Sequence, residues 1–245
     1  GDRIIIKNRA GNIPWIENIT VNKSLEFLSF DNDTFFVVQG NYTLVGATGR
    51  NISFIGMKNL SGSISYGSST GVQKGTNVHI LGSMFIAGGI SMNSYFFNTV
   101  IAHTQIDDGE IRLCFGAVIG CEIKSITTGS GSNAILVSSG ISSANDTIML
   151  IGNKILNETN SGTGIYFAST TTTLHCRNNF ITHRYMGIEM NGFLDGPINY
   201  IYNNTILATV TSSTHYGIAI NGTTASDIVE LMNNVLQSAA SGYKY

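Results

Sequence analysis

The feature that most constrains this chain is a short repeat in its second half. An asparagine-centred segment recurs at roughly 25 to 30 residues, a spacing typical of solenoid proteins, in which each repeat stacks on the next. The copies are GNKIL (152–156), RNNFI (177–181), YNNTI (202–206) and MNNVL (232–236). This period favours a fold built from stacked, similar turns.

A second marker follows each copy in the same order. After a loop of variable length comes a glycine that leads a short apolar or aromatic segment. These segments are Gly164-Ile165-Tyr166, Gly187-Ile188-Glu189, Gly217-Ile218-Ala219 and Gly242-Tyr243. Because two independent markers keep the same order, we interpret the second half as a series of equivalent turns.

The residues beside the markers indicate strands, because apolar side chains alternate over short distances and helical periodicity is not sustained. Examples are Ile148, Leu150 and Ile151, then Leu174 and Cys176, and then Ile198, Tyr200 and Ile201. A β-sandwich with ordinary Asn and Gly turns is the alternative interpretation, but a sandwich does not require markers that stay in register.

In a parallel coil, equivalent positions of successive turns stack at roughly 4.8 Å. We therefore predict that four asparagines form a ladder in which each side-chain amide hydrogen-bonds to the next. Asparagine also tolerates the left-handed conformation of a tight turn. The predicted ladder residues are Asn153, Asn179, Asn204 and Asn234.

The composition supports a folded, weakly charged β protein. Charged residues make up 11% of the chain and hydrophobic residues 42%, with a formal net charge of −2. This excludes a disordered chain, and the lack of a basic cluster argues against nucleic acid as a partner. No apolar run approaches the roughly 20 residues that span a bilayer, so we expect no membrane insertion.

Cysteines and sequons bear on the compartment. Cys114, Cys121 and Cys176 cannot all pair with one another, and without a CxxC or Cys/His cluster we expect buried thiols, no metal and no cofactor. The start GDRIIIKNR is not a signal peptide, so we expect that a leader has been removed or that a larger protein precedes it.

N-x-[ST] triplets, the acceptor sequence for N-glycosylation, begin at Asn18, Asn22, Asn32, Asn41, Asn51, Asn59, Asn145, Asn157, Asn203 and Asn221. Chance also produces such triplets in a chain rich in Asn, Ser and Thr.

The first half repeats more loosely, as short β-rich pairs punctuated by Gly, Asn or Ser. Its opening, with GDRIII, ENITVNKSLEFLSF (17–30) and DTFFVVQGNYTLVG (33–46), resembles the start of a β-helix of the pectin-lyase-like superfamily. The resemblance rests on Gly1-Asp2, Ile19–Leu25, Gly40–Tyr42, the N-N-x-I segments and the Gly-Ile segments.

The resemblance implies an all-β fold, a single-stranded right-handed parallel β-helix with roughly eight to ten rungs. We expect one domain over residues 1–245. Residues 1–48 would form the N-terminal rungs, residues 49–145 irregular rungs, and residues 146–245 regular rungs with the Asn ladder.

The same resemblance directs a search for carbohydrate-active chemistry. The hydrolases of this superfamily carry four motifs, N-T-D, a paired Asp, G-H-G and R-I-K. Only the paired Asp has a counterpart in this chain, Asp107-Asp108. The sequence Asp-Gly that follows is also an ordinary turn. The lyases use a Lys or Arg base beside a Ca²⁺ site of several acidic residues, and the acids here are scarce and dispersed.

A candidate ligand patch comes from aligning the loops between the two markers. The alignment places Glu158, His183-Arg184-Tyr185 and His215-Tyr216 on one side of adjacent rungs. Such side chains suit a sugar, because aromatic rings contact pyranoses while charged groups bind hydroxyls and carboxylates. A solvated row of loop tips is the alternative. The weak catalytic candidates are Asp107, Asp108, His183, Arg184 and His215.

Three hypotheses of function remain open. The first is a non-catalytic secreted or surface module, of an adhesin, fibre or viral appendage, that presents loops to a glycan or protein at the cell or virion surface. The second is a polysaccharide lyase or glycoside hydrolase with an atypical site. The third is a filament subunit that associates through the ends of the solenoid, whose last rungs expose strand edges.

Overall fold

A computed structural model describes residues 2–7, 9, 13–30, 35–70, 74–125, 133–138, 146–169, 172–191, 198–210, 216–221 and 228–237. In these ranges the chain forms strands and turns, without a helix. Accordingly, no helix long and apolar enough to cross a membrane occurs in the described ranges.

The strands form three sheets, A, B and C, in which each strand pairs in parallel with its neighbours. Sheet A contains β1 (Asp2–Ile6), β4 (Leu25–Ser29), β7 (Arg50–Ile55), β10 (Thr76–Leu81), β13 (Phe97–Ala102), β16 (Gly116–Ile119), β19 (Asp146–Ile151), β22 (Thr172–Arg177), β25 (Asn199–Tyr202) and β28 (Val229–Met232). Sheet B contains β2 (Trp15–Ile16), β5 (Phe36–Gln39), β8 (Met57–Asn59), β11 (Met84–Phe85), β14 (Gln105–Asp107), β17 (Glu122–Ser125), β20 (Lys154–Asn157), β23 (Phe180–His183), β26 (Thr205–Ala208) and β29 (Val235–Gln237). Sheet C contains β3 (Ile19–Val21), β6 (Tyr42–Gly46), β9 (Ile64–Ser69), β12 (Ile90–Met92), β15 (Ile111–Leu113), β18 (Ile135–Ser138), β21 (Thr163–Ala168), β24 (Met186–Asn191) and β27 (Tyr216–Asn221).

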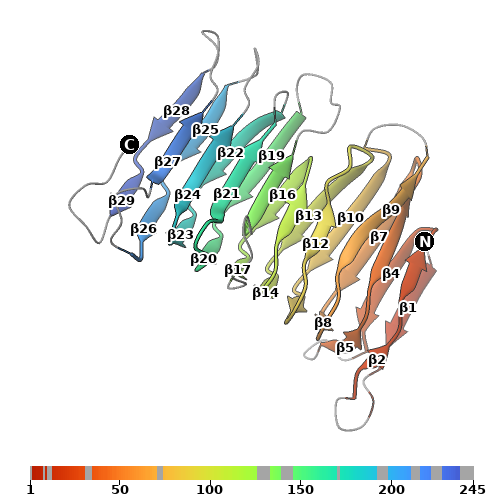
Figure 1. Cartoon of the computed structure of the whole chain (residues 1–245). Helices are drawn as coiled ribbons and strands as arrows, with labels where there is room; N and C mark the ends of the chain where they lie inside the picture. Colours follow the sequence, from red (N-terminus) through yellow and green to blue (C-terminus); the bar gives the residue numbers. More distant parts are fainter. Residues whose placement is uncertain are drawn as a thin grey trace.

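The chain visits sheets A, B and C in turn and then starts the next rung, which makes a right-handed parallel β-helix. The predicted fold is therefore confirmed. The first and last rungs lie at opposite ends of the stack (Figure 1). Each sheet consequently runs the length of the solenoid and ends in one strand edge at each end.

The turn from sheet A to sheet B has the same backbone conformation in rung after rung. One residue there takes a positive φ between 49° and 67°, and in every such turn but the last its N–H donates to the carbonyl at the end of the next sheet A strand. The residues at this position are Gly56, Gly82, His103, Gly120, Gly152, Asn178, Asn203 and Asn233. This left-handed conformation favours Gly and Asn, which explains the first residue of each G-N or N-N pair.

The second residue of each pair points inward and builds the asparagine ladder. Nδ2 of Asn153 donates to Oδ1 of Asn179 over 2.9 Å, and Nδ2 of Asn179 donates to Oδ1 of Asn204 over 2.9 Å. Nδ2 of Asn204 donates to Oδ1 of Asn234 over 3.0 Å. Each Oδ1 also accepts a hydrogen bond from the backbone N–H of the preceding ladder residue. The side-chain amides therefore satisfy backbone donors of the turn.

The ladder position continues into the first half of the chain with other side chains. The backbone N–H of Cys121 donates to Oδ1 of Asn153 over 3.0 Å, and the N–H of Met57 donates to Oγ of Ser83 over 3.2 Å. Ser83 in turn donates its N–H to Oγ1 of Thr104. The hydroxyls of Ser83 and Thr104 therefore replace amides in two of the irregular rungs.

The second marker requires glycine because the neighbouring backbone leaves no space for a Cβ atom. A Cβ on Gly164 would lie 2.7 Å from the carbonyl oxygen of Gly187, and a Cβ on Gly187 would lie 2.6 Å from that of Gly217. The predicted marker thus identifies an inner corner where successive backbones touch. Gly242 lies outside the described residues.

Inward side chains form columns along the axis that make up the core. In sheet C an isoleucine column continues through paired strands, and its members are at most 6% exposed. The column contains Ile64, Ile90, Ile111, Ile135, Ile165, Ile188 and Ile218. In sheet A the rings of Phe27 and Phe54 stack at 4.8 Å between centroids. Burial of each such side chain contributes about 1.5–3 kcal/mol.

Replacing Asn179 by Ala should lower the free energy of unfolding by about 3 kcal/mol, because it leaves buried partners on two neighbouring rungs without hydrogen bonds. The matched control is Asn77→Ala, which removes an amide from an outward row that joins Asn51, Asn77 and Asn98. Its cost should stay below about 1 kcal/mol, because water replaces the lost bonds. Urea unfolding measures both, and equal losses would contradict the ladder's role.

The three cysteines are buried thiols, and burial raises the pKa of Cys121 to about 11 and that of Cys176 to about 12. Since the thiolate is the reactive form, iodoacetamide at pH 8 should leave the folded chain unmodified. Mass spectrometry should detect three modified thiols once urea unfolds the chain. Rapid labelling of the folded chain would show that these sites open.

Candidate functional site

The paired aspartates lie at the end of a strand and in the turn that follows it. Asp107 ends β14 and accepts hydrogen bonds from Nε2 of Gln105 at 3.0 and 3.1 Å, while Asp108 has a φ of 57° in the following turn. Asp-Gly at the end of a strand is an ordinary turn sequence. The geometry favours the turn interpretation of Asp107-Asp108.

His183 lies inside the solenoid. It follows Ile181 on the inward face of β23, and its side chain is 0% exposed. Asn157 and Ala208 pair with it from the two neighbouring rungs. The sequence-based patch expected this imidazole on the surface with Arg184, whereas the structure buries His183.

The remaining patch residues divide between two places. Glu158 and Arg184 directly follow the paired residues Asn157 and His183, so they occupy equivalent turn positions on successive rungs. Tyr185 and Tyr216 are joined by a backbone hydrogen bond of 3.2 Å and line a hollow at the C-terminal end of the described solenoid. His215 lies outside the described residues.

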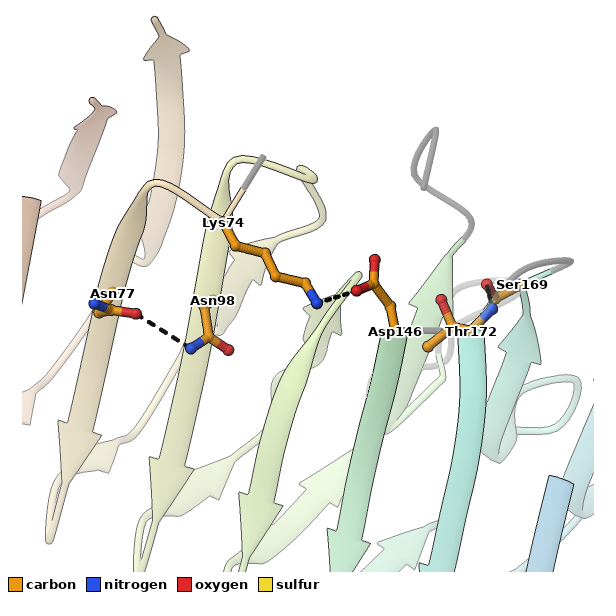
Figure 2. A network of polar contacts seen from close by, with 6 residues as sticks. All are labelled: Lys74, Asn77, Asn98, Asp146, Ser169 and Thr172. Atoms are coloured by element: carbon orange, nitrogen blue, oxygen red, sulfur yellow. Dashed lines mark hydrogen bonds and ion pairs between the residues drawn. The ribbon is translucent and has the colours of Figure 1, made fainter. Parts of the chain in front are cut away.

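A polar network near the start of the sheet A strands connects distant rungs (Figure 2). The Lys74 ammonium forms an ion pair with Asp146, whose side chain is 6% exposed, and lies 4.9 Å from the centroid of Phe115. Nearby, the backbone N–H of Thr172 donates to Oγ of Ser169 over 3.2 Å. Lys74 therefore neutralises the buried carboxylate of Asp146.

The outward face of sheet A carries a cluster that the sequence-based search missed. We call it the sheet A strip. It consists of His175 and Arg177 on β22, Tyr200 and Tyr202 on β25, and Glu230 on β28. The pairing aligns His175 with Tyr200 and Glu230 in one row, and Arg177 with Tyr202 in the next. Three adjacent strands therefore place aromatic, cationic and anionic groups together.

The rings of the strip contact one another. The centroids of His175 and Tyr200 are 4.7 Å apart with an interplanar angle of 32°, and Tyr200 meets Tyr202 edge-on at 5.6 Å. The faces of the first pair are turned toward each other. A ligand would thus meet ring edges and polar groups rather than a free aromatic face.

The charged side chains of the strip differ in whether they form hydrogen bonds or ion pairs with other side chains. Tyr202 donates a hydrogen bond to the Glu230 carboxylate, which raises the pKa of Tyr202 to about 12. The Arg177 side chain is exposed, and no hydrogen bond or ion pair joins it to another side chain within the described ranges. Arg177 is therefore available to an anionic group.

Among the residues that the structure describes, no three His, Cys, Asp or Glu side chains lie together in a way that could hold a metal ion.

The strip left a signal in the sequence that periodicity alone could have revealed. The segments LHCR (174–177) and NYIY (199–202) alternate inward residues with His, Arg or Tyr. Our sequence analysis grouped Tyr200 with the apolar residues, whereas the structure buries Ile201 and turns Tyr200 outward. Reading the outward positions of paired strands would have identified the cluster.

The imidazole of His175 should titrate below its usual range. Partial burial, and secondarily the Arg177 charge, lower its pKa. The folded chain then binds fewer protons than the unfolded chain just below pH 6.5, so stability should fall as the pH drops through this window. NMR titration of the His175 ring should show the lowered pKa, and Arg177→Gln should move it partly upward. An unshifted pKa in the wild-type chain would contradict this packing.

No protein-family model, curated protein or solved structure matches the chain. The similarity to the pectin-lyase-like superfamily thus stays at the level of the β-helix fold that the structure shows.

Proposed function

We propose that the chain is a non-catalytic, extracellular or surface-exposed β-helix module that binds acidic glycans on the sheet A strip. The observation that carries the proposal is the exposed, unengaged Arg177 beside the aromatic row of His175 and Tyr200. Arginine binds carboxylates in a bidentate manner, and such charge-assisted hydrogen bonds are about twice as strong as neutral ones.

The rigidity of the rungs supports this function. The strip residues stand on strands that are paired on both sides or at the end of sheet A, and the ladder residues Asn179 and Asn204 hold the turns below them. A binding surface on strands needs little reorganisation when a ligand arrives. Phenol hydroxyls and ring edges would then contact sugar hydroxyls while Arg177 contacts the acid.

The tilt between the rings favours acidic over neutral sugars. A neutral pyranose gains most from stacking on a free ring face, and the faces of His175 and Tyr200 are largely turned to each other. Selection should therefore come from charge and hydrogen bonding. The binding should weaken as salt is added, since the interaction between Arg177 and a sugar carboxylate would be exposed to solvent.

Arg177→Gln should weaken binding of polygalacturonate about tenfold, as expected for the loss of one charge-assisted interaction. Isothermal titration calorimetry with polygalacturonate, and with dextran as the neutral probe, measures the effect. Lys58→Gln is the matched control, because it removes one positive charge from sheet B and should leave binding unchanged.

Two outcomes would overturn the proposal. Equal weakening by Lys58→Gln would reduce the binding to nonspecific attraction, and undetectable binding of polygalacturonate would remove the acidic-glycan site. Release of shortened oligosaccharides that Arg184→Ala abolishes would instead support a carbohydrate-active enzyme.

A further inference from the structure

Two side chains that can carry a positive charge stand side by side on β22. His175 and Arg177 both point outward from this strand, and Cys176 between them is buried. Because alternate residues of a strand share a face, the two outward positions lie about 7 Å apart along β22. A sugar carboxylate that lies between them can therefore contact both side chains.

The imidazole of His175 has uncharged neighbours on both adjacent strands. On β25 the ring of Tyr200 packs against it, with 4.7 Å between the centroids. On β19 the paired residue is Met149, which is 39% exposed. His175 is itself only half-buried, so its ring remains within reach of a ligand on this face of sheet A.

The charged groups near His175 do not neutralise a protonated ring. Partial burial, and secondarily the positive charge of Arg177 on the same strand, lower the pKa of His175. Glu230 lies in the same row but two strands away, roughly 10 Å, and its carboxylate accepts a hydrogen bond from Tyr202. Among the described residues no carboxylate forms an ion pair with His175. An anionic ligand would supply the missing negative charge.

An acidic glycan keeps its charge over the range in which an imidazole titrates. Carboxyl groups titrate near pH 4 and an ordinary imidazole near pH 6.5, so a sugar carboxylate stays ionised while His175 takes up its proton. A carboxylate bound beside His175 favours the protonated ring. By linkage, the factor by which the ligand raises the proton affinity of the ring equals the factor by which the proton raises the affinity for the ligand.

We infer that His175 makes the chain bind acidic glycans more tightly at acidic pH, because its protonated ring places a second cation beside Arg177. The inference rests on the proposed glycan site and adds the regulation of that site by pH. Above about pH 7 the ring is neutral, and Arg177 alone binds the carboxylate. As the pH falls, the protonated ring joins it and the affinity rises.

Isothermal titration calorimetry with polygalacturonate at pH 7.5 and pH 5.5, at one ionic strength, tests the inference. The wild-type chain should bind roughly threefold more tightly at pH 5.5, as expected for one added exposed charge pair. His175→Gln should bind equally at both pH values. The matched control is His79→Gln, which makes the same change in the same outward row but four strands away, roughly 19 Å. This control should keep the wild-type pH dependence, because salt screens charges at that distance.

A second measurement uses the wild-type chain and so does not depend on how a variant folds. NMR titration of the His175 ring with polygalacturonate present should give a pKa higher by about 0.5 or more than in the free chain, which is the counterpart of a threefold change in affinity. Dextran, which carries no charge, should leave the pKa of the ring unchanged.

The outcomes separate this inference from the proposed function. Equal binding by the wild-type chain at the two pH values, or a pH dependence that His175→Gln retains, would overturn the regulation and leave the glycan site in place. Undetectable binding at both pH values would instead overturn the proposed function, and the inference with it.

Discussion

The hydrogen bond from one ladder asparagine to the next is the interaction on which the rest of the structure depends. In the regular rungs each turn from sheet A to sheet B pairs a left-handed residue with an inward asparagine, as in Asn178 and Asn179. The left-handed residue sets the corner, and the amide satisfies backbone groups that the corner buries. Unsatisfied buried amides would each cost about 1–3 kcal/mol, so the ladder aligns successive rungs as well as stabilising them.

Alignment of the rungs has a direct consequence for the surface. Once the turns are in register, inward residues form apolar columns and outward residues form rows with a spacing of roughly 4.8 Å. The Asn51, Asn77 and Asn98 row and the His175 and Tyr200 row arise in this way. Residues far apart in the sequence thus become neighbours, and any binding surface of this fold is a set of such rows.

The sequence predicted the fold and the ladder well because both depend on a repeated local pattern. An N-N pair and a Gly-Ile pair each report one backbone requirement, namely a left-handed turn or a corner without room for a Cβ. The sequence did not show the ladder in the irregular rungs, where Ser83 and Thr104 perform the task of asparagine with a different functional group.

The site was harder to predict, because the position of a side chain relative to the wall of the solenoid depends on strand register. Aligning loops by their distance from the markers put His183 and Arg184 together, although adjacent residues of a strand end point to opposite sides. The sheet A strip went unnoticed for the same reason, since Tyr200 resembles a core residue until its neighbours Asn199 and Ile201 are placed inside.

The most direct test of the central claim is NMR detection of couplings across the ladder hydrogen bonds. The account predicts that the backbone amide nitrogen of Asn153 couples to the side-chain carbonyl carbon of Asn179, and that of Asn179 to the side-chain carbonyl carbon of Asn204. Slow exchange of the same backbone amides with solvent should accompany these couplings. Fast exchange and absent couplings at both positions would contradict a ladder that aligns the rungs.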